Sequence, residues 1–374
     1  MSINIISDNI ISPLGFSSET NFKNILEGQS GIKRTDKFGG DDYVSIIDDQ
    51  ILDKEAGLFF NASEYTRFEK MSILSIHKAL SGCSINISSP ETAIVISTAK
   101  GNIDLIEEEK ANLYEPNRIA LWKSAEIISN HFGNPNKAIV ISNACISGTL
   151  ALVYANRLLS VGKYKDVVIV GCDIATQFIV SGFNCLKATD NKPCKPFDID
   201  RKGLNLGEGA ATIILSSQAR TKNEIKIATG SSSNDANHIS GPSRTGEGLY
   251  LSITDTLEQA KNIQVDMINP HGTGTLFNDE MESIAFSRCL EEDIPVCGLK
   301  GYFGHTLGAS GVIETVICKL SLQNNMLVKT LGYSQHGVSK PLNITQENIN
   351  QQLNTCLKTS SGFGGTNASI LLTK

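Results

Sequence analysis

Residues 137–163 read KAIVISNACISGTLALVYANRLLSVGK, and this stretch decides the fold. It opens with a short β-branched apolar run, KAIVISN (137–143), which is typical of a buried strand. Cys145 follows, and residues 147–163 then have the apolar spacing of a helix. Three side chains at i, i+4 and i+8 mark that spacing: Leu150, Tyr154 and Leu158. A strand, a cysteine and a helix are therefore expected in succession.

The same alternation of strands and helices extends along the chain. Six further apolar runs predict buried strands: ETAIVIST (91–98), DVVIVGC (166–172), GAATIILS (209–216), VDMIN (265–269), IPVCG (294–298) and ASILLT (368–373). Residues 279–290 and 309–323 have helical patterns, and the Ser-, Asn- and Gly-rich stretch 231–248 predicts a long loop. The chain is therefore expected to be an α/β protein with largely buried sheets. The expected strand VDMIN (265–269) is followed directly by Pro270 and His271, much as KAIVISN is followed by Ala144 and Cys145. This repeated arrangement hints at an internal duplication.

Composition excludes several classes of protein. The 374 residues are 40% hydrophobic and 19% charged, with a formal net charge of -6 and no Lys/Arg-rich run, so no nucleic-acid or membrane partner is indicated. The first 15 residues lack the pattern of a signal peptide, and no apolar run approaches the roughly 20 residues that span a bilayer. The nine cysteines are odd in number and form no CxxC pair, which favours free thiols over zinc or disulfides. We expect a cytoplasmic protein.

Cys145 lies in SNACISG, between the expected strand and helix. A nucleophile on such a turn is held rigidly, and the positive end of the helix dipole favours the thiolate. The small neighbours Ala144, Ser147 and Gly148 allow close approach of backbone and substrate. The alternative for any single cysteine is a small buried hydrophobic residue.

Two histidines have unusual surroundings. His271 lies in NPHGTGT directly after an expected strand, and His305 lies in KGYFGHTLGASG, five residues after Lys300. Either one alone is more often an ordinary hydrogen-bonded residue. The remaining histidines that we considered, His77, His131 and His336, have unremarkable surroundings.

A glycine-rich segment, SSGFGGTNAS (360–369), lies near the end of the chain. It lacks the lysine of a P-loop and precedes an expected strand instead of a helix. Its better use is close approach of the backbone to a ligand, with N–H groups turned towards an oxyanion.

Taken together, these segments resemble the β-ketoacyl-acyl-carrier-protein synthases in order and approximate spacing. SPLG (12–15), GQSGI (28–32), PFDIDRKGLNLGEGAATIIL (196–215) and Glu314, nine residues after His305, extend the resemblance over nearly the whole chain. The family implies a thiolase-like fold of two αβαβα halves in five layers. We place the first half, with the cysteine, at 1–215 and the second, with both histidines, at 216–374.

The resemblance also implies the reaction and the roles of residues. Cys145 would carry an acyl group, and a malonyl unit on acyl carrier protein would lose CO2 and attack it. His271 and His305 would donate hydrogen bonds to the enolate, and His271 would assist decarboxylation. Further roles fall to matched positions: the backbone N–H groups of Cys145 and Phe363 as oxyanion hole, Phe363 as gate, Thr273 and Thr275 at the phosphopantetheine arm, Lys300 with Glu314 as a structural charge pair, and Asp198, Arg201 and Glu208 as loop supports within the first half.

No metal or cofactor is expected, because the carrier protein supplies the phosphopantetheine. The partners implied are acyl carrier protein, malonyl and acyl thioesters, and a second chain in a homodimer or a heterodimer. Ser361 stands where elongating bacterial enzymes usually carry phenylalanine, and the chain is shorter by roughly a tenth. These departures open the possibility of a specialised polyene or polyketide product beside ordinary fatty acids.

The alternatives are a CoA-dependent thiolase-like enzyme, a silent chain-length factor, and an acyltransferase that does not condense. A thiolase would place a second cysteine where this chain has His305, and a silent partner would lack Cys145.

Overall fold

The computed structural model describes residues 3–110, 112–219, 224–261 and 263–374. Its largest element is a sheet with the strand order β13-β11-β10-β15-β16-β9-β1-β8-β6-β4-β5. The bounds of these strands, in chain order, are β1 Ile3–Ile11, β4 Thr92–Ser97, β5 Ile139–Ile141, β6 Asp166–Asp173, β8 Gly209–Ser216, β9 Lys226–Asn234, β10 Met267–Asn269, β11 Pro295–Val296, β13 Asn343–Ile344, β15 Thr355–Gly362 and β16 Thr366–Thr373.

The sheet is built from two halves with the same topology. Starting at the centre, the first half runs β1-β8-β6-β4-β5 and the second runs β9-β16-β15-β10-β11. In each half the first two pairings are antiparallel and the next two are parallel. The halves join where β1 and β9 pair briefly, Ile3 with Ile227 and Asn4 with Lys226. The internal duplication is therefore confirmed, although the dividing point between residues 215 and 216 stays a prediction.

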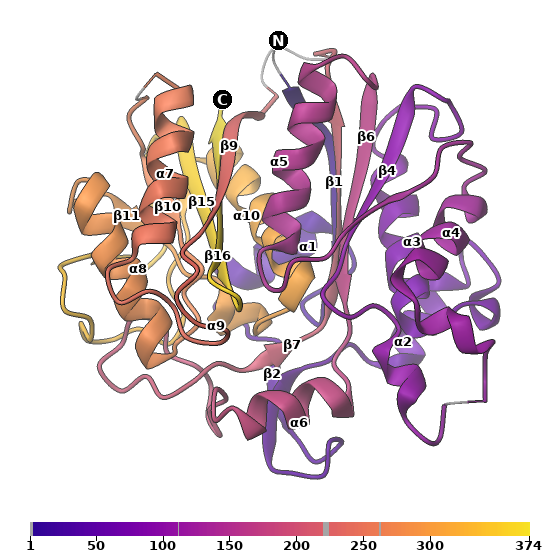
Figure 1. The fold of residues 1–374 in the computed structure, drawn as a ribbon, viewed down its shortest axis with the longest axis horizontal. Coiled ribbons are helices and arrows are strands. Elements are labelled where there is room, and N and C mark those ends of the chain that lie inside the picture. The colour runs from indigo at the N-terminus through magenta and orange to yellow at the C-terminus, as the bar shows by residue number, and fades with distance from the viewer. Residues whose placement is uncertain (1–2, 111, 220–223, 262) are drawn as a thin grey trace.

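The helices complete five layers. Their bounds are α1 Ser18–Leu26, α2 Asp49–Ala56, α3 Arg67–Leu80, α4 Leu121–His131, α5 Ser147–Ser160, α6 Gln177–Cys185, α7 Glu247–Gln259, α8 Leu276–Cys289, α9 Lys300–Phe303 and α10 Ser310–Asn324. Figure 1 shows α5 and α10 between the halves of the sheet, with α3 and α4 outside one half and α7 and α8 outside the other. The expected α/β, five-layered fold is confirmed.

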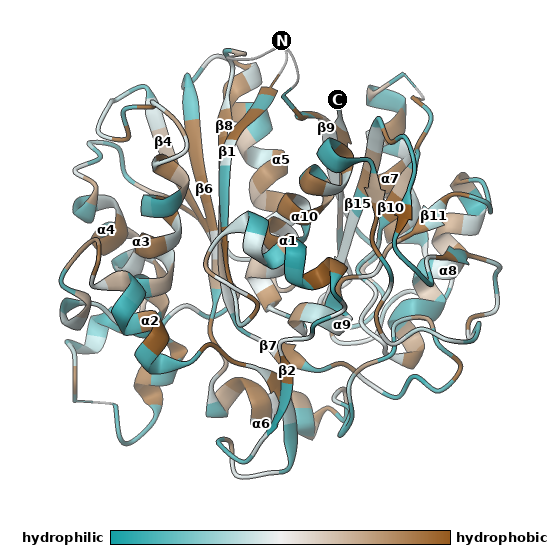
Figure 2. Cartoon of the chain, turned by 180° about the vertical axis from the view of Figure 1, so that it is seen from behind, coloured by the Kyte–Doolittle hydropathy of each residue, from teal (hydrophilic) through white to brown (hydrophobic). Residues whose placement is uncertain are grey.

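Strands such as β6 and β8 are mainly apolar because helices cover both faces of the sheet. β8 buries all its residues and β6 all but its first. Figure 2 colours α5, α10 and β6 mainly brown, as expected for elements enclosed on several sides. The central layer therefore forms the core beside which the loops that carry Cys145, His271 and His305 lie.

Three expectations need correction. β5 is half-buried and not buried, because it forms an edge of the sheet and has a strand on one side only. The expected loop 231–248 is shorter, since β9 continues to Asn234 and α7 begins at Glu247. On α5 the apolar face is also broader than expected, and Tyr154 points outward with 37% of its surface exposed.

Two small sheets lie outside the layers. Strands β2 (Ile32–Thr35), β3 (Asp42–Ser45) and β7 (Leu206–Gly207) form one, and β12 (Met326–Leu327) pairs with β14 (Ile349–Asn350). Figure 1 shows α6 close to β2 and β7, below the central layer. Within the described ranges, no helix combines the length and the apolar character needed to cross a membrane.

Candidate active site

Cys145 lies on a tight turn between β5 and α5. Ala144 has a φ of 46°, a left-handed conformation that non-glycine residues rarely adopt, and it turns the chain sharply before the cysteine. The Ser147 hydroxyl fastens this turn, because it accepts from Asn143 N at 2.8 Å and donates to Ala144 O at 2.6 Å. The first turn of α5 therefore follows directly behind the thiol.

The start of α5 packs tightly on the start of α10. A Cβ at Gly148 would lie 2.8 Å from Val312 N, and a Cβ at Gly311 would lie 2.2 Å from Thr149 N. Only glycine leaves room for this contact. Since α5 follows the cysteine and α10 follows His305, the contact fixes the distance between the two catalytic segments.

His271 follows β10 in a loop that α8 supports. The Glu282 carboxylate accepts from His271 N at 2.6 Å and from Gly272 N at 2.7 Å. Asp279, one turn earlier, accepts from Thr273 N at 3.0 Å. Two buried acids on one helix face thus hold the backbone of NPHGTGT.

His305 follows a short helix, α9, and precedes α10. Gly304 has a φ of 69° and reverses the chain between them. The Ser310 hydroxyl lies 3.2 Å from His305 Nδ1. If this hydroxyl donates to Nδ1, the ring carries its proton on Nε2, on the other side of the imidazole.

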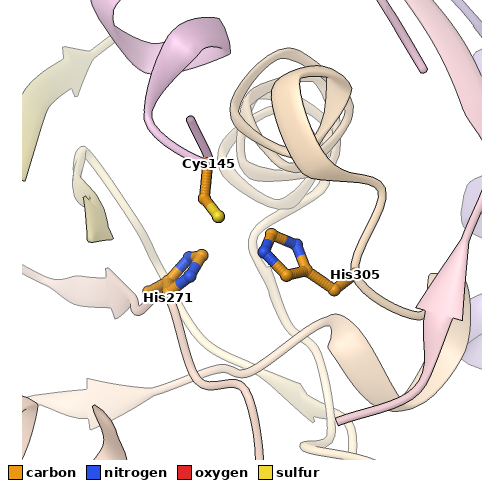
Figure 3. Close-up of side chains that lie close together, drawn as sticks. All are labelled: Cys145, His271 and His305. Atoms are coloured by element: carbon orange, nitrogen blue, oxygen red, sulfur yellow. The ribbon is translucent and has the colours of Figure 1, made fainter. Parts of the chain in front are cut away.

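The three side chains meet in the interior. Figure 3 shows the sulfur of Cys145 directed at the space between the rings of His271 and His305. One ligand-type atom of each residue lies within 4.8 Å of the others, and the ring centroids are 5.0 Å apart. All three residues are buried. Residues from both halves of the fold therefore converge at one point.

A buried group of charges adjoins this point. Lys300 Nζ donates to His271 O at 2.6 Å and to Glu314 Oε1 at 2.7 Å. Lys358 Nζ, from β15, lies 2.6 Å from the second oxygen of Glu314. Lys300 therefore contacts the backbone of His271, and not the ring of His305 beside which the sequence placed it. Lys358 did not enter the sequence interpretation.

The protonation states of the site follow from burial and from these lysines. Burial, Lys300 and Lys358 all lower the pKa of His271 and of His305 well below its usual range, so both rings are neutral at pH 7. Burial acts to raise the pKa of Glu314, but Lys300 and Lys358 outweigh it and hold it below its usual range. Glu314 is therefore a carboxylate.

The protonation state of Cys145 in the free protein differs from the expectation. Burial raises the pKa of the Cys145 thiol to about 11, although a backbone hydrogen bond from Phe363 and the charge of Lys300 act in the opposite direction. The sequence interpretation expected the helix terminus to favour thiolate. In the free protein burial prevails, and the nucleophile rests as a thiol.

The glycine-rich segment forms the tip of the β15–β16 hairpin beside Cys145. A Cβ at Gly362 would lie 3.2 Å from Cys145 N, so the backbone at 362–363 approaches the amide of the cysteine. Phe363 stacks on Phe183 of α6, with ring centroids 5.7 Å apart. The backbone N–H of Phe363 also forms a hydrogen bond with the Cys145 thiol, and the oxyanion role of the two amides stays a prediction.

A cleft of about 410 Å³ leads from the surface to the cysteine. Thr273 and Thr275 line it, with their hydroxyl oxygens 2.9 Å apart, and Ser361 lines it near Phe363. Lys187 and Lys202 also line it and are exposed. The cleft combines a mainly apolar lining with these polar side chains, and it can admit a flexible arm that delivers a thioester.

The loop supports act more widely than expected. Glu208 does hold the first half, through Arg67 and through Ile47 N at 2.8 Å. Asp198, however, accepts from Ser334 N at 2.7 Å, and Arg201 donates to Gly337 O. These two residues tie the first half to the second, instead of bracing the first half alone.

A metal ion is not the expected occupant of the site. Cys145, His271 and His305 form the one cluster of donors within metal-binding reach of each other in the described residues. Lys300 and Lys358 place two ammonium groups next to this cluster, which disfavours a further cation.

Other residues were missed because their sequence gave no signal. Lys358, Glu282 and Asp279 lie within an ordinary strand and an ordinary helix, and only the fold brings them to the site. His77 on α3 and His131 on α4, which were expected to be unremarkable, belong to the outer helices of the first half. Their Nε2 atoms are 2.7 Å apart.

Comparison with known proteins agrees with this geometry. The models for the beta-ketoacyl synthase N-terminal and C-terminal domains match residues 1–220 and 225–334. A putative mitochondrial 3-oxoacyl-[acyl-carrier-protein] synthase of Schizosaccharomyces pombe is 29% identical, with 97% of each chain covered. The tetracenomycin polyketide synthase ketoacyl synthase alpha subunit of Streptomyces glaucescens is 30% identical, over 84% of this chain and 82% of that protein.

A solved structure confirms the fold. The complex of a ketosynthase with its chain length factor from Xenorhabdus doucetiae contains a chain that matches with a TM-score of 0.89 at 22% identity, covering 100% of this chain and 98% of that one. The chain therefore belongs to the β-ketoacyl synthase family, which are acyltransferases that form carbon–carbon bonds.

Proposed function

We propose that this chain condenses an acyl group held on Cys145 with a malonyl unit carried by acyl carrier protein. One observation carries the proposal: a buried thiol and two neutral imidazoles meet at the inner end of a cleft that opens to the surface. This set provides a nucleophile and two uncharged hydrogen-bond donors, which the two half-reactions need.

In the first half-reaction, the Cys145 sulfur attacks the carbonyl carbon of an acyl thioester. The bond to the carrier's sulfur breaks, and the proton of the Cys145 thiol leaves with the carrier thiol. The negative charge that develops on the carbonyl oxygen is met by the backbone N–H groups of Cys145 and Phe363. The product is an acyl-cysteine.

In the second half-reaction, malonyl-acyl-carrier-protein loses CO2, and its electrons form an enolate. The enolate carbon attacks the acyl-cysteine carbonyl, the bond to Cys145 breaks, and the released thiolate takes up a proton from solvent. His271 and His305 donate hydrogen bonds to the thioester oxygen while it carries negative charge. The product is a β-ketoacyl thioester that is longer by two carbons.

The cleft supports delivery of both substrates by a carrier protein. Thr273 and Thr275 would bond the amide groups of the phosphopantetheine arm, which the carrier supplies. The site would then need no cofactor of its own. The Schizosaccharomyces pombe relative is named for an acyl-carrier-protein substrate, and the Streptomyces glaucescens relative for polyketide synthesis, so the proposal covers fatty-acid and specialised products.

We also propose that two chains associate along β5. This strand is a half-buried, apolar sheet edge, a feature that proteins rarely leave uncovered. The Xenorhabdus doucetiae ketosynthase pairs with a chain length factor, so the second chain is either a copy or a homologue. Light scattering tests this: twice the 40.3 kDa chain mass indicates a homodimer, and an active monomer would contradict the proposal.

A cytoplasmic location stays a prediction, supported by nine free cysteines.

Two measurements test the reaction. Labelling with cerulenin, followed by peptide mapping, is expected to give one adduct on Cys145, absent from Cys145→Ala. Incubation with acyl- and malonyl-acyl-carrier-protein is expected to release CO2 and β-ketoacyl product in equal amounts. Acyl loading without CO2 release would indicate a simple transferase, and no labelling of Cys145 would favour a silent partner.

A further inference from the structure

Lys358 is fully buried in β15, next to the catalytic site but outside its expected machinery. Its Nζ lies 2.6 Å from Glu314 Oε2 and donates to Thr359 O at 2.5 Å. A buried lysine needs a compensating charge, and Glu314 is its ion-pair partner. That partner is shared, because Lys300 binds the other oxygen of the same carboxylate.

This sharing leaves a charge imbalance. Two ammonium groups meet one carboxylate, so the cluster of Lys300, Lys358 and Glu314 carries a net charge of +1. The cluster also forms a chain of contacts, from Lys358 through Glu314 and Lys300 to the backbone oxygen of His271. Lys358 can therefore influence the histidines through both charge and position.

The other titratable groups next to the cluster cancel only part of this charge at neutral pH. Glu282 of α8 is a buried acid that interacts with Lys300, and burial raises its pKa to about 7, so it is about half ionised. Cys318 of α10 faces Lys358 and Glu314, and its pKa is raised well above the usual range by burial and by Cys356. Cys318 is therefore a neutral neighbour, whereas Glu282 offsets part of the positive charge.

We propose that Lys358 is a positioning residue of the condensing site. Its ammonium group leaves a net positive charge beside His271 and His305. This charge acts with burial to keep both imidazoles in the neutral, hydrogen-bond-donating form. It also favours the enolate, in which the negative charge of the malonyl carboxylate moves to the thioester oxygen inside a buried site. The effect on the enolate rests on the condensation proposed above, whereas the effect on the histidines does not.

Histidine-labelled NMR of the whole protein tests the charge directly. The chain has six histidines, and His271→Asn and His305→Asn assign the two signals of interest. In the wild type neither signal should titrate near neutral pH. In Lys358→Met both should titrate about one pH unit or more higher than in the wild type, because one pKa unit equals a tenfold change in protonation equilibrium. Lys319→Met, on the same helix as Glu314 but paired with Asp8, is the matched control.

A double variant separates charge from packing. Glu314→Gln with Lys358→Met leaves Lys300 alone, so the net charge returns to +1. If charge is the cause, the histidine titration returns towards that of the wild type, although both side chains are altered. Titration that stays shifted in the double variant would overturn the charge argument in favour of geometry.

Turnover gives the functional readout. Decarboxylation of malonyl-acyl-carrier-protein by Lys358→Met is expected to lose about tenfold in kcat with KM unchanged, since the charge acts on the developing anion and not on binding. Lys358→Gln, which keeps a hydrogen-bond donor for Glu314, serves as the second neutral variant if Lys358→Met does not fold. A folded neutral variant with wild-type histidine titration would overturn the proposal. A wild-type protein that shows the expected titration but no condensation would contradict only the proposed function.

Discussion

At the scale of single residues, the resting form of Cys145 is open to a direct test. Because burial raises the pKa of the thiol to about 11, alkylation by iodoacetamide should be slow at pH 7 and should quicken about tenfold per pH unit towards that pKa. Lys300 lowers the thiol pKa, so Lys300→Met should shift the profile to higher pH. Cys145→Ala gives the background rate, and a plateau below pH 8 would contradict the prediction.

Glu314 is the residue on which the buried charges depend. Glu314→Gln would leave Lys300 and Lys358 buried without a counter-charge, and breaking a buried pair in this way costs about 3–5 kcal/mol in the free energy of unfolding. Urea denaturation measures this. Adding Lys358→Met to Glu314→Gln should recover part of the loss, whereas independent sites would give additive losses.

At the scale of elements, the contact between α5 and α10 sets the active-site geometry. Gly311→Ala would force a Cβ to within 2.2 Å of Thr149 N and should destabilise the fold by about 1–3 kcal/mol, with loss of condensation. Gly182→Ala in α6 is the control, because a Cβ there meets nothing within 4 Å. Equal thermal midpoints for the two variants would show that the helices can separate without cost.

Comparison of the expected and observed strands shows which elements the sequence can predict. GAATIILS was predicted as a strand and forms β8 over the same residues, because a β-branched run buried on both faces carries its own signal. The serines at 231–233 favour a loop, yet they form the end of β9, because pairing with β16 overrides this local preference. Lys358 gives no signal at all: its role depends on Glu314, which lies on another element and is brought to it only by the fold.

The candidate catalytic residues were predictable for a related reason. Cys145, His271 and His305 each follow a strand end or a glycine, where loops present side chains, so their segments stand out locally. The acids that support them, Asp279 and Glu282, repeat at helical spacing and look like any solvated helix face. Sequence therefore identified the groups expected to touch substrate better than those that hold them.

At the scale of the whole molecule, the net charge of -6 would repel an acidic carrier protein. Lys187 and Lys202 place positive charge at the cleft that leads to Cys145, where the phosphate of the arm would enter. We expect Lys187→Glu with Lys202→Glu to raise KM for acyl-carrier-protein substrates about tenfold, at roughly 0.5–1 kcal/mol for each exposed contact. The loss should shrink as salt screens the contact.

A small thioester substrate tests whether the two lysines act on the carrier protein or on the shape of the cleft. An acyl-pantetheine without protein or phosphate reaches Cys145 through the same cleft but presents no anion to the two lysines. Its kcat/KM should therefore be unchanged in the double variant, and Lys163→Glu, just beyond the far end of α5, should leave both substrates unaffected. If the small thioester loses as much as the carrier substrate, the lysines shape the cleft itself. The carrier would then have to dock elsewhere on the surface.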